Sequence, residues 1–144
     1  MPAQCSSIVG VTTASALQIN KQGTQSTSDD WCYITGQYTE DKTFLDLISR
    51  DDPTAGLKLT YLGTKCSNGK NREFNIILTC ADKLNPSPLH AVETSPCVYT
   101  VTMPSVYGCP LECPVSKRSL CGGAGFCGYD YDNQKARCYC NKGS

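Results

Sequence analysis

Eleven cysteines in a chain of 144 residues constrain this sequence more than any other feature. A density this high is typical of disulfide-linked proteins that fold in an oxidising compartment. A set of zinc sites is a weaker interpretation, because the sequence has one histidine, His90, and no pair of cysteines spaced as Cys-x-x-Cys. We therefore expect disulfides, and a location in the lumen of the secretory pathway or outside the cell.

The charge pattern excludes several classes of partner. Thirteen basic and thirteen acidic residues cancel, and no basic stripe is present, so nucleic acids and anionic membranes are poor partners. No apolar run approaches the roughly 20 residues of a membrane span. The first residues, MPAQCSSIVGVTT, lack the charged head and apolar core of a secretory signal. We interpret the chain as a mature form or an excised fragment.

Short β-branched and apolar runs separated by turn residues recur up to Cys109, and they favour an all-β fold. The predicted strands are residues 8–11, 16–19, 31–38, 57–62, 72–80 and 97–103. Residues 43–49 fit either a strand or a helical turn, and Asp52-Pro53 should break the chain after them. Residues 85–88, Asn-Pro-Ser-Pro, predict a loop.

The strongest predicted strand, residues 72–80, begins with an arginine. Side chains alternate between the two faces of a strand, so Arg72 shares a face with three apolar residues, Phe74, Ile76 and Leu78. If this face points inward, Arg72 lies at the mouth of a barrel or sandwich, where it can meet a ligand. Ile77 lies on the opposite face, so the choice of inward face stays open.

The sequence after Cys109 is rich in cysteine and glycine and too short for an apolar core. Its spacing, Cys113-x7-Cys121-x5-Cys127-x10-Cys138-x-Cys140, resembles an epidermal-growth-factor-like (EGF-like) module. That resemblance implies a hairpin turning at Asp132-Asn133 and the bonds Cys113–Cys127 and Cys121–Cys138. Cys140 would be the fifth cysteine of the family, whose sixth would follow beyond the end, so we expect a truncated module with Cys140 unpaired.

Three groups of residues in the part of the chain up to Cys109 form a second pattern. They are Trp31-Cys32-Tyr33 with Gln37-Tyr38; Tyr61-Leu62-Gly63 with Cys66, Arg72 and Cys80; and Glu93-x3-Cys97-x-Tyr99 with Pro104 and Cys109. Together they resemble the mannose 6-phosphate receptor homology (MRH) domain, a lectin fold. The likeness is to its endoplasmic-reticulum members, the lectins that read trimmed glycans and the β subunit of glucosidase II. It implies a flattened β-barrel or sandwich over residues 1–110, followed by the EGF-like module at 111–144.

The MRH resemblance also implies bonds and a binding site. The disulfides would be Cys5–Cys32, Cys66–Cys97 and Cys80–Cys109, and the mannose-binding residues would be Gln37, Arg72, Glu93 and Tyr99. A guanidinium donates in a planar fork, a carboxylate only accepts, and an amide and a phenol do both. Four such groups can satisfy neighbouring hydroxyls of one hexose. The wrong sugar would leave buried polar groups unpaired, at about 1–3 kcal/mol each.

Plainer interpretations exist for each of these residues. Arg72 alone fits a strand-edge ion pair with Glu73 or Asp82, Glu93 alone a solvated carboxylate, and Tyr99 alone a packed aromatic. Three other glutamines compete with Gln37 for the fourth position: Gln18, Gln22 and Gln25.

The sequence lacks the residue patterns of a phosphate site, a calcium site and a catalytic site. Lys83 and His90 form no cluster for a phosphate, so we expect plain mannose to be favoured over mannose 6-phosphate. Pro110-Leu111-Glu112 lacks the acidic residues that precede calcium-binding EGF-like modules, so we expect no metal. We also expect no cofactor and no catalysis, since the lone histidine has no partner in a recognisable motif and the chain is short for the facing carboxylates of a glycosidase.

Two functions remain. The first is a lectin module that binds mannose-containing N-glycans or glycoproteins. The second is a structural or adhesive unit of a larger extracellular or filament-forming glycoprotein, which contacts neighbouring copies or domains and binds no sugar. The sequence contains no Asn-x-Ser/Thr acceptor, and O-glycosylation of Thr24–Ser28 stays open.

Overall fold

The structure is a computed structural model that describes residues 14–20, 31–41, 43–83 and 89–142. These residues are almost entirely in strands and turns, so the predicted all-β, disulfide-rich class is confirmed. The elements are β1 Ala16–Asn20, β2 Trp31–Gly36, β3 Thr43–Leu47, η1 Pro53–Ala55, β4 Leu57–Lys65, β5 Asn71–Cys80, β6 Val92–Ser95, β7 Val98–Ser105, η2 Val106–Gly108, β8 Val115–Ser116, β9 Ser119–Leu120, η3 Cys121–Gly123, β10 Gly125–Asp130 and β11 Lys135–Cys140, where η denotes a short 3-10 helix.

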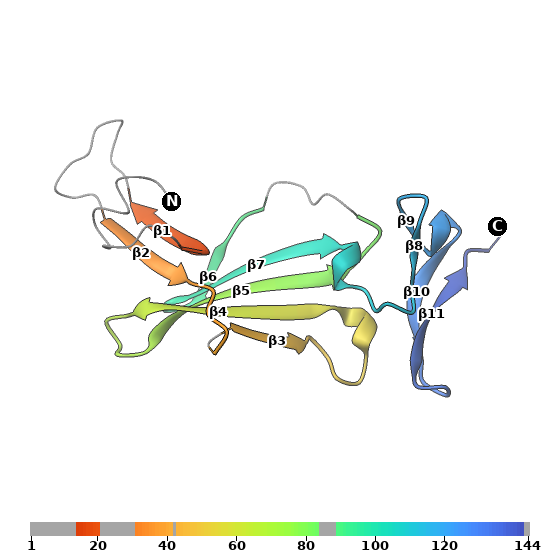
Figure 1. Ribbon diagram of the computed structural model, residues 1–144, viewed down its shortest axis with the longest axis horizontal. Helices are drawn as coiled ribbons and strands as arrows, with labels where there is room; N and C mark the ends of the chain where they lie inside the picture. The colour runs from red at the N-terminus through yellow and green to blue at the C-terminus, as the bar shows by residue number, and fades with distance from the viewer. Residues whose placement is uncertain (1–13, 21–30, 42, 84–88, 143–144) are drawn as a thin grey trace. The chain divides into compact units, whose positions relative to one another are not determined.

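The strands form one larger sheet and three hairpins (Figure 1). The larger sheet has the order β3-β4-β5-β7-β6, and the hairpins are β1-β2, β8-β9 and β10-β11. The larger sheet ends at β3 and β6, so within the described residues it is an open sheet rather than a closed barrel. In the same residues, no helix is long and apolar enough to cross a membrane.

Most strands lie where the sequence predicted them. β1, β2, β4, β5 and β7 cover the predicted runs with shifted ends, and the ambiguous run at 43–49 contains strand β3. The predicted break after it is also confirmed, because Asp52 caps η1 by accepting a hydrogen bond from the Thr54 N–H at 3.0 Å. β6 was not predicted, because Val92–Ser95 is mostly polar and exposed. The predicted strand at 8–11 and the loop at 85–88 lie outside the described residues.

The chain contains two compact units, and β4, β5 and β7 each run through both. The first unit comprises Met1–Phe44, Thr60–Asn75 and Val92–Thr100; the second comprises Leu45–Leu59, Ile76–Ala91 and Val101–Ser144. The predicted division at residues 110 and 111 stays a prediction.

In the first unit, two glycines let the β1-β2 hairpin approach β4 and β5. A Cβ atom at Gly63 would collide with the carbonyl oxygen of Ile34, and one at Gly36 would lie 2.9 Å from the Cβ of Phe74. The Thr64 hydroxyl donates to the same Ile34 oxygen at 3.3 Å. Because only glycine lacks a Cβ, these two positions allow the hairpin to lie directly on the sheet face that carries Phe74.

The first unit also contains the disulfide Cys66–Cys97, which joins the turn after β4 to the turn after β6. In the second of these turns, Pro96 precedes Cys97, which has a left-handed backbone with φ of 66°. Proline followed by a residue of positive φ is the pattern of a type II turn, which usually has glycine at the second of these positions.

The second unit is built around a small apolar cluster. Val106, Cys113, Leu120 and Ala136 are its buried members, and Cys80, Cys109, Cys121, Cys127 and Tyr129 pack against them. The unit holds the disulfides Cys80–Cys109, Cys113–Cys127 and Cys121–Cys138, while Cys140 is free. These pairs are the ones that the two family resemblances implied. Cys5–Cys32 cannot be compared, because Cys5 lies outside the described residues.

One polar contact ties the end of strand β5 to the cysteine-rich segment. The Leu120 N–H donates to the Asp82 carboxylate at 2.7 Å, and Leu120 itself is only 4% exposed. The cluster therefore draws on residues from both sides of the predicted boundary at residue 110, all of them within the second unit.

This cluster gives a test of stability. We expect Leu120→Ala to lower the free energy of unfolding by about 2–5 kcal/mol, because it removes a buried side chain and leaves a cavity. Leu111→Ala is the matched control, since Leu111 is 97% exposed, and its effect should stay within about 0.5 kcal/mol. Chemical denaturation of both variants measures the difference, and equal effects would contradict the described cluster.

Candidate functional site

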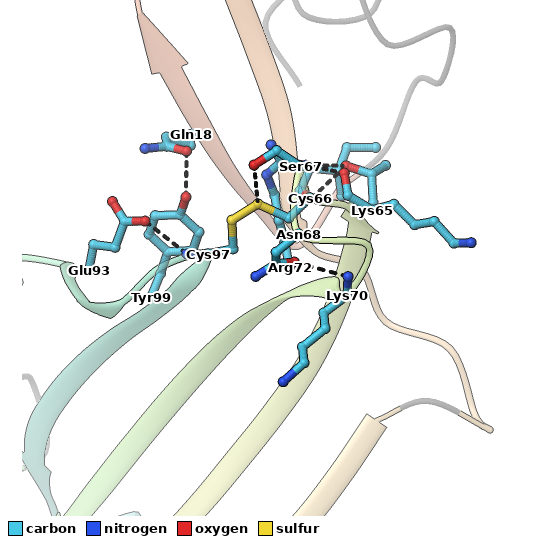
Figure 2. The surroundings of a disulfide bond; sticks show 12 residues. Gln18, Lys65, Cys66, Ser67, Asn68, Lys70, Arg72, Glu93, Cys97 and Tyr99 are labelled. Atoms are coloured by element: carbon cyan, nitrogen blue, oxygen red, sulfur yellow. Dashed lines mark hydrogen bonds between the residues drawn. A yellow bond between two sulfur atoms is a disulfide. The ribbon is translucent and has the colours of Figure 1, made fainter.

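The candidate site centres on Tyr99 of β7, a residue only 8% exposed. Its hydroxyl donates a hydrogen bond of 2.7 Å to the side-chain oxygen of Gln18 in β1. Figure 2 shows the phenol pointing toward the Gln18 amide, with Glu93 beside it. Two strands 81 residues apart in sequence are thus joined by one buried polar contact.

The pKa of Tyr99 reports the charges around it. Burial raises the pKa of the phenol above its ordinary value of 10.0, and the nearby Glu93 carboxylate raises it further. The guanidinium of Arg72 opposes this rise. Since both charges act on one phenol, the structure brings together three of the four residues expected to bind mannose: Arg72, Glu93 and Tyr99.

Arg72, at the start of β5, is buried, and its guanidinium is held on two sides. Its Nη1 donates to the carbonyl oxygen of Lys65 at 2.5 Å and, more weakly, to the Thr64 hydroxyl at 3.4 Å. The Tyr33 ring of β2 covers one face of the guanidinium, 3.9 Å from the ring centre, which is a cation–π arrangement. The edge ion pair with Glu73 or Asp82 is therefore not what holds this side chain.

One donor of Arg72 remains unused. The Nε atom is buried and has no hydrogen-bond partner among the described residues. Buried polar groups in native proteins are nearly always paired, so an unpaired N–H inside a cluster of polar side chains needs a specific explanation.

Glu93 of β6 is exposed but not freely solvated. Its Oε1 accepts a hydrogen bond of 2.9 Å from the Cys97 N–H, across the turn that joins β6 to β7. Glu93 also lies opposite Tyr99 in the register of these two antiparallel strands, which places both side chains on one face. An ionised carboxylate accepts several hydrogen bonds, so its second oxygen keeps capacity for a ligand.

Among the described residues, Gln37 makes no hydrogen bond to this cluster. Its backbone N–H bonds the Leu62 carbonyl oxygen at 3.1 Å, and among the described residues its side chain has no hydrogen bond. Gln18 occupies the position beside Tyr99 instead. Of the competing glutamines, Gln22 and Gln25 lie outside the described residues.

Strand register explains why Gln18 reaches the site. Gln18 pairs directly with Tyr33 across the β1-β2 hairpin, so the two side chains share a face. On that face Tyr33 covers Arg72 and Gln18 bonds Tyr99. Sequence analysis missed Tyr33 as a part of the site. The alternation of Trp31 and Tyr33 was a usable signal, because alternate residues of a strand share one face; their rings are 5.0 Å apart.

The chemistry available at this cluster is hydrogen bonding to a polar, neutral ligand. It offers guanidinium donors, a carboxylate acceptor, and an amide and a phenol that do both. Among the described residues, Arg72 and Glu93 form no direct ion pair with each other.

Two other features of the described residues do not form comparable sites. The sulfurs of Cys113, Cys121 and Cys138 lie close enough together to hold a metal, but each belongs to a disulfide and is not a free thiolate. A hollow of about 470 Å³ along residues 106–115 is lined mainly by apolar residues, among them Tyr107, Leu111 and Val115. It brings no polar side chains together.

Comparisons with known proteins give a likeness to solved structures but none to a family model or a curated protein. No family model matches the sequence, and no curated protein matches it. A solved structure described as the MRH domain of Yos9 complexed with alpha3,alpha6-Man5 is similar to part of the chain, with 19% identity and a TM-score of 0.40. The match covers 62% of this chain and 62% of that one. A likeness at this level does not determine a function.

The raised pKa of Tyr99 predicts the behaviour of the site at alkaline pH. The phenol keeps its proton longer in the folded state than in the unfolded one, so its contribution to stability is complete below about pH 10 and is lost as pH rises through the folded pKa. We expect Glu93→Gln to lower the pKa of Tyr99, because the carboxylate raises it, and Arg72→Met to raise it further.

Nuclear magnetic resonance (NMR) titration of the Tyr99 ring, assigned with a Tyr99→Phe variant, measures these shifts. A Tyr99 pKa that does not respond to either substitution would contradict the placement of the two charges beside the phenol.

Proposed function

We propose that this chain is a lectin module of the MRH type, of the endoplasmic-reticulum subgroup, that binds mannose-containing N-glycans in the secretory pathway or outside the cell. The observation that carries the proposal is the buried, unpaired Nε–H of Arg72 within the cluster of polar side chains around Tyr99. The residue pattern in the sequence that resembles the MRH domain supports it independently.

The free edge of Arg72 suits two neighbouring hydroxyls. Lys65 and Thr64 bond Nη1, whereas the opposite edge of the guanidinium, formed by Nε and Nη2, faces away from both, and Nε has no partner among the described residues. Adjacent oxygens of a hexose can accept from Nε and Nη2 at once. An unpaired buried donor costs about 1–3 kcal/mol, and a ligand oxygen at Nε removes that cost.

The other side chains complement this edge. The second oxygen of Glu93 accepts from sugar hydroxyls, and the phenol oxygen of Tyr99 accepts while its own proton is directed to Gln18. The side-chain oxygen of Gln18 accepts the hydrogen bond from Tyr99. The N–H groups of the same amide are then the donors that a ligand can meet. We propose Gln18, Arg72, Glu93 and Tyr99 as the binding residues, with Gln18 in the role first expected for Gln37.

The proposal includes several expectations that follow from the sequence. We favour unphosphorylated mannose, no metal, no cofactor and no catalytic activity, and we assign residues 111–144 to an EGF-like module. A single shallow site that uses a few hydrogen bonds binds weakly, so repetition or tethering of the module would be needed for strong binding.

A structural or adhesive role is the second candidate, and the second unit favours it. Three disulfides and a shared apolar cluster make that unit a cross-linked body in which the cysteine-rich segment packs on the end of the sheet strands within the unit. Such a body suits a rigid part of a larger extracellular glycoprotein that contacts neighbouring copies or domains.

Substitution of the binding residues decides between the two functions. We expect the oxidised chain to bind mannose-rich glycans on an array, and Arg72→Ala to weaken binding at least about tenfold, because hydrogen bonds to charged groups contribute about 1.5–3 kcal/mol. Arg50→Ala is a matched control, since Arg50 lies on the surface, with 83% of its side chain exposed.

The two glutamines form a second matched pair. Gln18→Ala should weaken glycan binding while Gln37→Ala leaves it unchanged, with thermal unfolding showing that each variant folds. The reverse result would restore the original assignment of Gln37. Absence of any glycan binding by the folded, oxidised chain would favour the structural role.

A further inference from the structure

Both charged residues of the proposed site are held by backbone groups at one disulfide, Cys66–Cys97. Arg72 donates to the carbonyl oxygen of Lys65, the residue before Cys66, and Glu93 accepts from the N–H of Cys97 itself. Figure 2 shows the disulfide lying between these two contacts. The disulfide therefore links two supports: the Lys65 carbonyl group, which holds the Arg72 guanidinium, and the Cys97 N–H, which holds the Glu93 carboxylate.

Apart from the disulfide, these two supports are joined through strand β5, which lies between β4 and β7 in the sheet. In the described residues, the turn after β4 and the turn after β6 are connected by the disulfide, while the Glu73 N–H donates to the Cys97 carbonyl oxygen at 3.0 Å from the adjoining strand. Within the turn after β4, the Cys66 N–H donates a hydrogen bond of 2.8 Å to the Lys70 carbonyl oxygen. Opening the disulfide would leave each turn intact but let the two move apart.

The backbone of Cys97 makes the position of Glu93 depend on the bond. Cys97 has a φ of 66°, a conformation that residues with a side chain rarely adopt without support. In this conformation its N–H points at the Glu93 carboxylate. Once the sulfur is free, Cys97 can relax to a negative φ, its N–H turns away, and Glu93 loses its anchor.

This bond differs from the other three described disulfides in lying outside the apolar cluster of the second unit, and both of its cysteines are partly exposed. Each of the others has at least one cysteine in or against the apolar cluster of the second unit: Cys80 and Cys109, Cys113 and Cys127, and Cys121. Cys66 lies instead beside the exposed hydroxyl of Ser67, at 3.9 Å, in a polar turn. Thiol–disulfide exchange requires access of the attacking thiolate to sulfur.

We propose that Cys66–Cys97 is a redox switch of the candidate site, closed when oxidised. This inference rests on the proposed function for its consequence, glycan release, but not for its structural part. A dithiol supplies the reducing equivalents. One of its thiolates attacks a sulfur of the pair and displaces the other cysteine as a thiolate; its second thiolate then resolves the mixed disulfide. The protein gains two electrons and two protons as two thiols, and the dithiol becomes a cyclic disulfide.

Graded treatment of the oxidised chain with dithiothreitol tests the switch. Alkylation and mass spectrometry identify which cysteines open first, and NMR follows hydrogen exchange of the Arg72 Nε–H. That group is buried, whereas Arg50, Arg118 and Arg137 are exposed, so its signal exchanges slowly and can be recognised. Once Cys66 and Cys97 become alkylated, we expect the Arg72 exchange rate to rise at least about tenfold and glycan binding to fall to a similar extent.

A double variant provides the permanently open state. Cys66→Ser/Cys97→Ser should reproduce the reduced protein, and Cys121→Ser/Cys138→Ser, which removes a bond of the second unit, should leave Arg72 exchange unchanged. If either variant fails to fold, partial reduction of the native chain still gives both readouts.

The outcomes separate the two proposals. If Cys66–Cys97 stays closed while the fold is intact, or if Arg72 exchange stays slow after this bond has opened, the switch is wrong whether or not glycan binds. If the intact chain binds no mannose glycan but Arg72 exchange responds to reduction, the switch stands and the proposed ligand fails.

Discussion

Cross-linking by disulfides is the constraint on which the rest of this structure depends. Few apolar side chains are fully withdrawn from solvent in the described residues, and the largest side chains of any kind that are completely buried there are the polar Thr35 and Ser105. Four described disulfides close loops with separations of 31, 29, 14 and 17 residues. In the chain-entropy account, each such bond stabilises the fold by about 3–4 kcal/mol, because it restricts the unfolded chain. Bonds of this kind compensate for a small apolar core.

A small core leaves room for polar groups at its edge. In the first unit, the β1-β2 hairpin lies on the sheet through two glycines rather than through large apolar side chains. The face it covers carries Arg72 and Tyr99, which are each 8% exposed and surrounded by polar partners. Burial of this cluster raises the pKa of Tyr99 and leaves one Arg72 donor unpaired. The same packing that excludes water from these groups therefore leaves an unpaired donor inside a polar cluster.

The Cys66–Cys97 bond belongs both to the disulfide framework and to the surroundings of the candidate site. It closes the longest of the described disulfide loops, and its flanking backbone groups hold Arg72 and Glu93. A cross-link that stabilises the fold thus also determines the geometry of the candidate site. In a protein with a larger core, such side chains could be positioned by packing alone; here the disulfide and the left-handed Cys97 carry that role.

The sequence by itself determined the all-β class and most of the strands, and it predicted three residues of the candidate site. Alternation, turn residues and cysteine spacing are local signals, and Arg72, Glu93 and Tyr99 stand at recognisable intervals from cysteines. Only the tertiary structure placed Gln18 beside Tyr99. Gln37 is close to Cys32 in sequence, yet its strand ends in a bridge to Leu62, whereas Gln18 reaches Tyr99 because its register with Tyr33 turns it onto the sheet. Strand pairing and the approach of one hairpin to a sheet depend on contacts between distant segments, which no local pattern encodes.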